Sequence, residues 1–148
     1  MSTAFDAYVD RLRLENIAMI GAGISHYQLL KLFAQRGLSV TLLDRRGADA
    51  LPVAEELSSL GITLCLGEKY LDHLDRYTLV FRTPGMYYHH EKLTGARERG
   101  IRITSEMEEF FALCPCPIVA VTGSDGKTTT TSLIARMYEE DGRTVWLG

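Results

Sequence analysis

The sequence has no apolar run that approaches the roughly 20 residues needed to cross a bilayer. Residues 1–6 have neither a basic segment nor an apolar stretch, so they do not resemble an export signal. These two absences exclude a membrane span and a secretory leader as interpretations of the sequence. We therefore expect a cytoplasmic protein without a membrane partner.

Positive charge is not in excess either. The formal net charge is −3, and lysine and arginine are scattered along the chain. The densest basic run, residues 97–102, alternates with a glutamate and a glycine and is typical of a solvated helix end. Nucleic acid is therefore not an expected partner.

Cysteine is scarce, with three residues in the chain. Cys65 lies in an apolar run, where a small buried thiol is expected. Cys114 and Cys116 alternate with prolines, and no second Cys/His pair is near enough to complete a zinc site. The cysteines predict no metal centre.

What the sequence does contain is an ordinary globular composition, 46% hydrophobic and 24% charged over 148 residues. Short apolar runs alternate with segments of helical periodicity at βαβ spacing, which predicts an α/β fold: a Rossmann-like parallel sheet with helices on both faces. The predicted strands are 16–20, 39–44, 62–66, 78–82 and 101–104. The predicted helices are 5–12, 25–36 (capped by Ser25), 52–60, 70–74, 91–99 and 107–113.

A change in pattern follows at 114–117, where Pro115 and Pro117 resist both helix and sheet. We interpret 1–113 as one domain, 114–117 as a linker and 118–148 as the start of a second. In that start we predict a strand at 118–122, a loop, a helix from Lys127 to about 140, and a strand at 144–147. Such a unit is too small to bury its own sheet, so we expect the second domain to be truncated.

The sharpest motif is the loop of that second segment. Its residues are Gly123, Ser124, Asp125, Gly126, Lys127, Thr128 and Thr129. Glycines allow backbone N–H groups to turn around a phosphate, and the following helix adds its positive N-terminal end. Lys127 would reach the β- and γ-phosphates and Thr128 would bind Mg²⁺. The common phosphate-loop pattern has glycine where Val121 stands, and the alternative is an ordinary polar turn.

A second glycine-containing turn follows the first predicted strand. Gly21 and Gly23 form a G-x-G pattern, with His26 at the place of the third glycine of a dinucleotide fingerprint. Asp44 ends the next strand, where an acidic residue would face a ribose. On these residues alone, ligand binding and a purely structural turn remain equally open, and His26 is expected to be a core or surface histidine rather than a catalyst.

The loop pattern T-G-[ST]-x-G-K-[ST], matched by residues 122–128, resembles the Mur ligase superfamily. The resemblance implies that the loop binds ATP and Mg²⁺, with Lys127 and Thr128 in catalytic roles. A substrate carboxylate would be phosphorylated, and an amine would attack the acyl phosphate to form an amide. Folylpolyglutamate synthetases share the loop but begin with the ATPase domain, so their domain order does not fit.

The first domain has Gly23-Ile24-Ser25-His26 in its first turn, Asp44-Arg45-Arg46 after the second strand and Thr83-Pro84-Gly85 after the fourth. These features resemble the D-glutamate-adding branch of that superfamily, whose substrates are UDP-N-acetylmuramoyl-L-alanine and D-glutamate. The resemblance implies that Asp44 and the adjoining backbone read the uracil, that amides near Ser25 and Thr83 hold the pyrophosphate, and that Arg45 or Arg46 assists. The implied UDP-substrate residues are Gly23, Ile24, Ser25, His26, Asp44, Arg45, Thr83, Pro84 and Gly85. The L-alanine-adding sister ligase remains an alternative, although it usually has histidine at the position of Asp125.

Three further expectations remain open. A non-catalytic module that binds NAD or another nucleotide fits Asp44, and an NAD-dependent dehydrogenase ranks below it. The resemblance places the remaining metal ligands and the amino-acid domain beyond Gly148, so the 148 residues alone are expected to be inactive. The strands predicted at 118–122 and 144–147 would leave open edges that could pair two copies into a homodimer.

Overall fold

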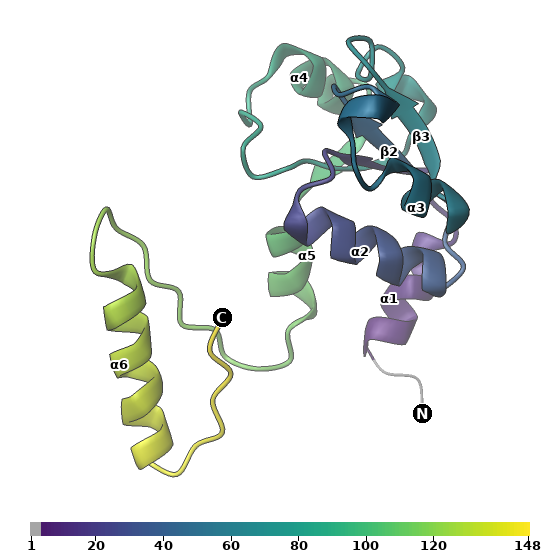
Figure 1. Cartoon of the computed structure of the whole chain (residues 1–148). Coiled ribbons are helices and arrows are strands. Elements are labelled where there is room, and N and C mark those ends of the chain that lie inside the picture. Colours follow the sequence, from purple (N-terminus) through teal and green to yellow (C-terminus); the bar gives the residue numbers. More distant parts are fainter. Residues whose placement is uncertain (1–3) are drawn as a thin grey trace. The chain divides into compact units, whose positions relative to one another are not determined.

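The computed structural model describes residues 4–148 (Figure 1). By its internal contacts the chain divides into two compact units, one ending at Leu113 and one spanning Cys114–Gly148. None of the helices among the described residues is long and apolar enough to cross a membrane.

The first unit is built on a five-stranded sheet in which every neighbouring pair is parallel. Its strands are β1 (Ile17–Ile20), β2 (Val40–Asp44), β3 (Thr63–Leu66), β4 (Leu79–Phe81) and β5 (Arg102–Thr104). They lie in the order β3-β2-β1-β4-β5. The central strand β1 is buried along its whole length, as expected for a strand covered on both faces. The chain reverses its direction of winding between β1 and β4, and ligands of such sheets bind at this switch point.

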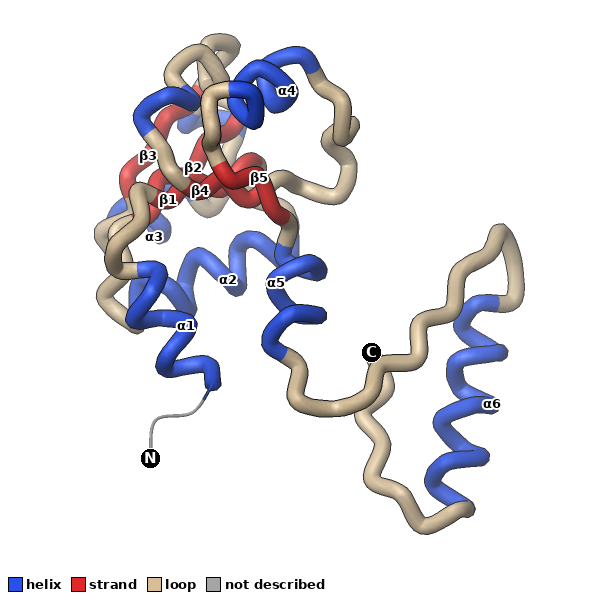
Figure 2. The backbone as a smooth tube through the Cα atoms, turned by 180° about the vertical axis from the view of Figure 1, so that it is seen from behind, coloured by secondary structure: helices blue, strands red, loops and turns tan. Residues whose placement is uncertain are grey.

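Helices cover both faces of the sheet, as Figure 2 shows from behind. They are α1 (Ala4–Leu12), α2 (Ile24–Gln35), α3 (Ala54–Ser59), α4 (Glu91–Glu98) and α5 (Glu106–Leu113), with 3-10 turns at Ala48–Ala50 and Leu74–Arg76. Met19 and Phe81 pack on one face with Phe33 of α2. Ile20 and Val80 pack on the other face with residues that include Leu93 of α4. The predicted Rossmann-like α/β fold is confirmed.

Two local predictions in this unit are wrong. The helix predicted at 70–74 is a series of turns followed by the 3-10 turn Leu74–Arg76, because the segment is too short to repay helix nucleation. Ser25 does not cap α2. The N-cap is Gly23, and no side chain bonds to the first amides of the helix.

The second unit contains one helix, α6 (Lys127–Glu140), which starts where predicted. The strands predicted at 118–122 and 144–147 are not formed, and both segments run as irregular chain within the described structure. A strand requires a hydrogen-bonded neighbour, and neither segment has one. Within 114–148, all of which is described, Ala135 is the only buried residue.

Candidate functional site

The turns after β1 and β4 meet at the switch point of the sheet. Gly21 follows β1 with a φ of +81°, a conformation that favours glycine, and its N–H donates to Leu43 O at the end of β2 over 2.7 Å. A Cβ at Gly21 would lie 3.7 Å from the Cβ and Cγ2 of Thr83. The glycine turn and the Thr83-Pro84-Gly85 turn therefore lie side by side at the carboxyl edge of the sheet.

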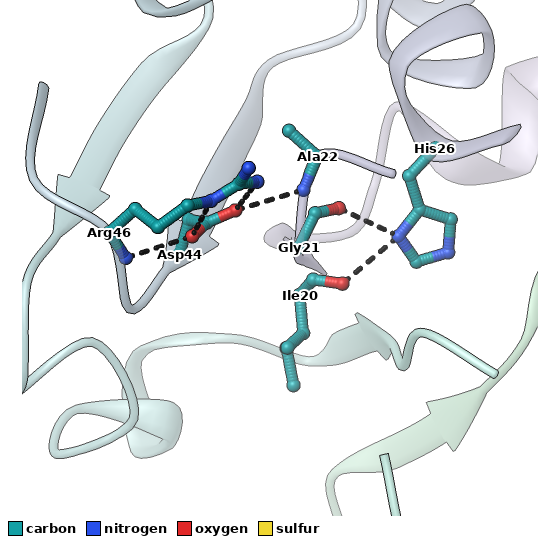
Figure 3. Close-up of polar contacts among 6 residues, drawn as sticks. All are labelled: Ile20, Gly21, Ala22, His26, Asp44 and Arg46. Atoms are coloured by element: carbon teal, nitrogen blue, oxygen red, sulfur yellow. Dashed lines mark hydrogen bonds and ion pairs between the residues drawn. The ribbon is translucent and has the colours of Figure 1, made fainter. Parts of the chain in front are cut away.

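Asp44 ties this edge together through four hydrogen bonds (Figure 3). Its Oδ2 accepts the Ala22 N–H at 3.1 Å and Arg46 Nη2 at 2.8 Å. Its Oδ1 accepts the Arg46 backbone N–H at 2.9 Å and Arg46 Nε at 3.0 Å. The carboxylate is buried, whereas the Arg46 side chain is about half exposed. Asp44 thus fixes the glycine turn from one side and holds a solvent-facing guanidinium on the other.

The same contacts hold Asp44 ionised. Hydrogen bonding from the Arg46 side chain, which outweighs the opposing effect of burial, lowers the pKa of Asp44 from 3.8 to about 2. Because the pKa is depressed on folding, the ionised group stabilises the fold fully above the unfolded pKa near 4, and that contribution disappears as the pH falls towards 2.

We therefore predict that acid destabilises the protein less steeply when Asp44 is replaced by asparagine. Between pH 5 and pH 2 the wild-type protein should lose about 2 kcal/mol of unfolding free energy that Asp44→Asn has already lost at pH 5. Urea unfolding at a series of pH values measures the difference between the two proteins. Parallel stability curves over that range would contradict the prediction.

His26 is buried in the first turn of α2 and faces the end of β1 (Figure 3). Its Nδ1 lies 3.0 Å from Ile20 O and 3.1 Å from Gly21 O. Carbonyl oxygens only accept hydrogen bonds, so Nδ1 is the donor in both contacts. Nε2 is buried without a partner among the described residues. The histidine that replaces the third glycine of the fingerprint therefore clamps the helix onto the glycine turn.

Removing this clamp should destabilise the first unit. His26→Leu leaves the buried Ile20 carbonyl and the partly buried Gly21 carbonyl without their donor, and we expect a loss of about 1–3 kcal/mol in unfolding free energy. His26→Asn places an amide N–H donor where Nδ1 lies and should restore much of it. Chemical denaturation of the three proteins tests this, and equal losses for leucine and asparagine would argue against the clamp.

The other predicted first-domain residues are placed as follows. Gly23 caps α2, and Ile24 and Ser25 follow it at the exposed start of the helix, where Ile24 is 90% exposed. Thr83 is half-buried against Gly21, while Pro84 and Gly85 are exposed. Of the two arginines after Asp44, it is Arg46 that pairs with the carboxylate, and Arg45 is exposed. Sequence reasoning did not identify the Ala22 amide, whose role depends on backbone geometry alone.

In the loop of the second unit, the lysine side chain bonds to the backbone of the loop itself. Lys127 Nζ donates to Gly123 O at 2.6 Å and to Ser124 O at 3.0 Å. Gly126, the N-cap of α6, has a φ of +73°, which allows the chain to turn into the helix. Thr131 Oγ1 donates to Lys127 O at 2.8 Å, which ties the first turn of α6 together.

A pocket of about 280 Å³ opens at the start of α6. Lys127 and Thr128 line it from the helix, and Val121 and Leu147 line it from the two irregular segments. An ammonium group, a hydroxyl and the helix N-terminus at one opening make an arrangement suited to a phosphate group and its cation. Ser124, Asp125 and Thr129 lie exposed beside it in the loop and first helical turn.

A family model for the N-terminal domain of MurD-like Mur ligases matches residues 15–105, which hold the whole sheet, the glycine turn, Asp44 and Thr83. The chain belongs to this family. The MurD-like match spans more than half of the chain and lies within the first unit. The resemblance to Mur ligases inferred from the sequence is therefore confirmed.

Curated relatives extend the similarity over the entire chain. The UDP-N-acetylmuramoylalanine–D-glutamate ligase of Clostridium botulinum strain Hall is 40% identical, and that of Clostridium novyi strain NT is 43% identical. Each alignment covers 100% of this chain and 32% of the relative. The chain thus spans about a third of the length of the curated relatives that it matches.

Solved structures show the same fold. A murein peptide ligase from Psychrobacter arcticus superposes with a TM-score of 0.57 at 26% identity, covering 86% of this chain and 27% of that one. A UDP-N-acetylmuramate–alanine ligase from Thermotoga maritima superposes with a TM-score of 0.54 at 25% identity, covering 90% and 32%. One is a murein peptide ligase and the other is the ligase MurC, in agreement with the MurD-like family match.

Proposed function

We propose that this chain is the nucleotide-substrate-binding part and the start of the ATP-binding part of a peptidoglycan precursor ligase. The full-length protein would add D-glutamate to UDP-N-acetylmuramoyl-L-alanine. The observation that carries the proposal is the convergence of the glycine turn, Asp44–Arg46 and the Thr83 turn at the switch point of a MurD-like domain. The names of the curated relatives support the choice of D-glutamate over L-alanine.

In the first domain, the role proposed for each group follows from its contacts. The exposed start of α2 has no side-chain cap, so its amides and the helix dipole are available to a pyrophosphate. Asp44 is saturated by Arg46 and Ala22, so it acts by holding the turn and the guanidinium in place. The exposed residues of the two turns, including Ile24, Pro84 and Gly85, would border the nucleotide sugar.

In the second domain, Lys127 and the amides of the Gly123–Thr129 loop would bind the phosphates of ATP, and Thr128 would bind Mg²⁺. Phosphorylation of the substrate carboxylate would give an acyl phosphate, which the amine of D-glutamate attacks to form the amide and release phosphate. Lys127 would stabilise the negative charge that develops on the transferred phosphoryl group. A cytoplasmic location belongs to the same proposal, because ATP is consumed there.

The 148 residues alone are not expected to form the amide bond. The chain spans about a third of the length of its curated relatives, and within 4–148 no group of three or more His, Cys, Asp or Glu side chains is arranged to hold a metal. ATP- and protein-dependent incorporation of D-glutamate by the 148-residue chain would contradict this expectation.

A homodimer of the 148-residue chain is a weaker part of the proposal. Segments 118–122 and 144–147 have unpaired backbone groups, and Val119 and Leu147 are more than half exposed. Pairing between copies would cover both. A monomeric mass by light scattering at high concentration would remove this part.

The decisive experiment is calorimetric titration of the chain with UDP-N-acetylmuramoyl-L-alanine, with UDP, NAD and Mg-ATP as comparisons. We expect the UDP-sugar to bind more tightly than UDP and NAD not to bind. Preference for NAD would instead support a dinucleotide-binding module. That alternative is disfavoured because both Asp44 oxygens, which would accept the ribose hydroxyls, are engaged by Arg46.

A further inference from the structure

Two arginines on the α4 side of the sheet have buried donors without partners. Arg82 directly follows β4, and Arg97 lies near the end of α4. Among the described residues, Arg82 Nε and Arg97 Nη2 are buried and make no hydrogen bond. A buried donor left unpaired costs about 1–3 kcal/mol. Both donors belong to positively charged side chains, so an anion from outside the chain could accept their hydrogen bonds.

Both guanidinium groups contact one aromatic ring. The ring centroid of Tyr88 lies 3.9 Å from Arg97 Cζ and 5.6 Å from Arg82 Cζ. Arg97 Nη1 also donates to the Tyr88 backbone oxygen at 2.8 Å, which fixes the arginine against the loop. The face of an aromatic ring carries only weak negative charge, so Tyr88 balances two full positive charges incompletely. Tyr88 lies in a turn and is 47% exposed, so its ring is not locked in by the core.

The charge of this pair is not balanced by a close carboxylate. Glu108 Oε1 lies 3.8 Å from Arg82 Nη2, beyond hydrogen-bonding distance, and the Glu108 side chain is half exposed. Three other arginines of the same unit have closer carboxylates: Arg36 with Asp6 at 3.0 Å, Arg46 with Asp44 at 2.8 Å and Arg102 with Glu109 at 2.9 Å. Arg82 and Arg97 therefore share one ring and have no carboxylate as close as those three pairs do.

We propose that Arg82 and Arg97 form an oxyanion-binding site for a carboxylate or phosphate group, and that Tyr88 occupies the site until the anion displaces its ring. Guanidinium N–H groups match the geometry of both anions and bind them with charge-assisted hydrogen bonds. Arg82 precedes Thr83, which packs near Gly21, so the site borders the carboxyl edge of the sheet. Neither arginine is among the residues proposed to bind the nucleotide sugar, so the proposal does not depend on which nucleotide that edge binds.

The test follows the arginine side-chain Nε–H signals of the 148-residue chain by NMR during titration with inorganic phosphate and, separately, with acetate. Ionic strength is held constant with chloride. We expect saturable shifts of the Arg82 and Arg97 signals, which are assigned from Arg82→Lys and Arg97→Gln. Arg97→Gln should weaken anion binding roughly tenfold or more, because a charge-assisted bond is lost. Tyr88→Ala should strengthen binding several-fold, because the ring no longer competes.

Arg36→Gln is the matched control. Arg36 also lies over a ring, with its Cζ 5.0 Å from the Phe5 centroid, but it has Asp6 as a close partner. This variant should leave the anion response unchanged. If Arg97→Gln fails to fold by circular dichroism, Arg82→Lys provides the same test, since it keeps the charge and removes the unpaired Nε donor.

Saturation by phosphate alone identifies a phosphoryl ligand, and saturation by acetate alone identifies a carboxylate. Absence of saturable shifts in both the wild type and Tyr88→Ala overturns the proposal. Because neither probe contains a nucleotide, that failure is distinguishable from a failure to bind UDP-N-acetylmuramoyl-L-alanine.

Discussion

Replacing Lys127 with methionine is expected to abolish measurable Mg-ATP binding by the chain, with a loss of roughly a hundredfold or more in affinity. In the free protein Lys127 Nζ donates to Gly123 O and Ser124 O, which places its charge inside the loop. On binding ATP the ammonium group would exchange these carbonyl oxygens for phosphate oxygens, and each charge-assisted bond contributes about 1.5–3 kcal/mol. Methionine keeps most of the side-chain volume, so the effect should be on binding and not on folding. Calorimetric titration of both proteins measures it.

Arg136→Met is the matched control for this prediction. Arg136 lies on the same helix and pairs with Glu139 and Glu140 at the surface, away from the loop. Its replacement also removes one positive charge from α6 but should change ATP affinity by less than about threefold, because charges beyond a Debye length are screened. Equal losses for the two variants would show that the net charge of the helix matters and that Lys127 has no specific role. Unchanged binding by Lys127→Met would exclude the loop as the phosphate site.

The sheet could be predicted from the sequence because its signals are local. Residues 17–20 are continuously apolar and Gly21 follows them, and residues 40–43 are apolar except for Thr41, which is the pattern of a buried parallel strand. The second unit shows the limit of the same reasoning. Residues 118–122 have strand-forming side chains, yet a strand exists only where a neighbour accepts its hydrogen bonds. Periodicity reports what a segment prefers and does not report whether a partner is present.

The position of the candidate site could be predicted from the sequence, but its hydrogen bonds could not. The sequence placed Asp44 at the end of β2 and Gly21 at the end of β1, and parallel strands bring such ends to one edge. The sequence did not show that Arg46, and not Arg45, donates hydrogen bonds to the Asp44 carboxylate. That choice depends on the backbone conformation after the strand. No sequence pattern indicates the unpaired donors of Arg82 and Arg97, because they depend on how these side chains pack against Tyr88.

Replacing Asp44 with asparagine is expected to weaken binding of UDP-N-acetylmuramoyl-L-alanine by roughly ten- to a hundredfold. The Asp44 carboxylate accepts four hydrogen bonds through two oxygens, whereas asparagine has one acceptor oxygen. Arg46 therefore loses its carboxylate partner, and the Ala22 amide and Arg46 compete for the single oxygen. Loss of a charge-assisted network costs about 1.5–3 kcal/mol. Calorimetry gives the affinity, and the thermal midpoint of each protein separates weaker binding from unfolding.

Asp72→Asn is the control, because Asp72 forms an exposed ion pair with Lys92 at 3.0 Å and such surface pairs contribute little. The double variant Asp44→Asn/Arg46→Gln then decides how Asp44 acts. If Asp44 works by holding Arg46, the double variant should bind as weakly as the weaker single variant and no more weakly, because both changes break one unit. If Asp44 contacts the nucleotide itself, the two losses should add. Additive losses would therefore overturn the positioning role that the four hydrogen bonds assign to Asp44, while leaving it a residue of the binding site.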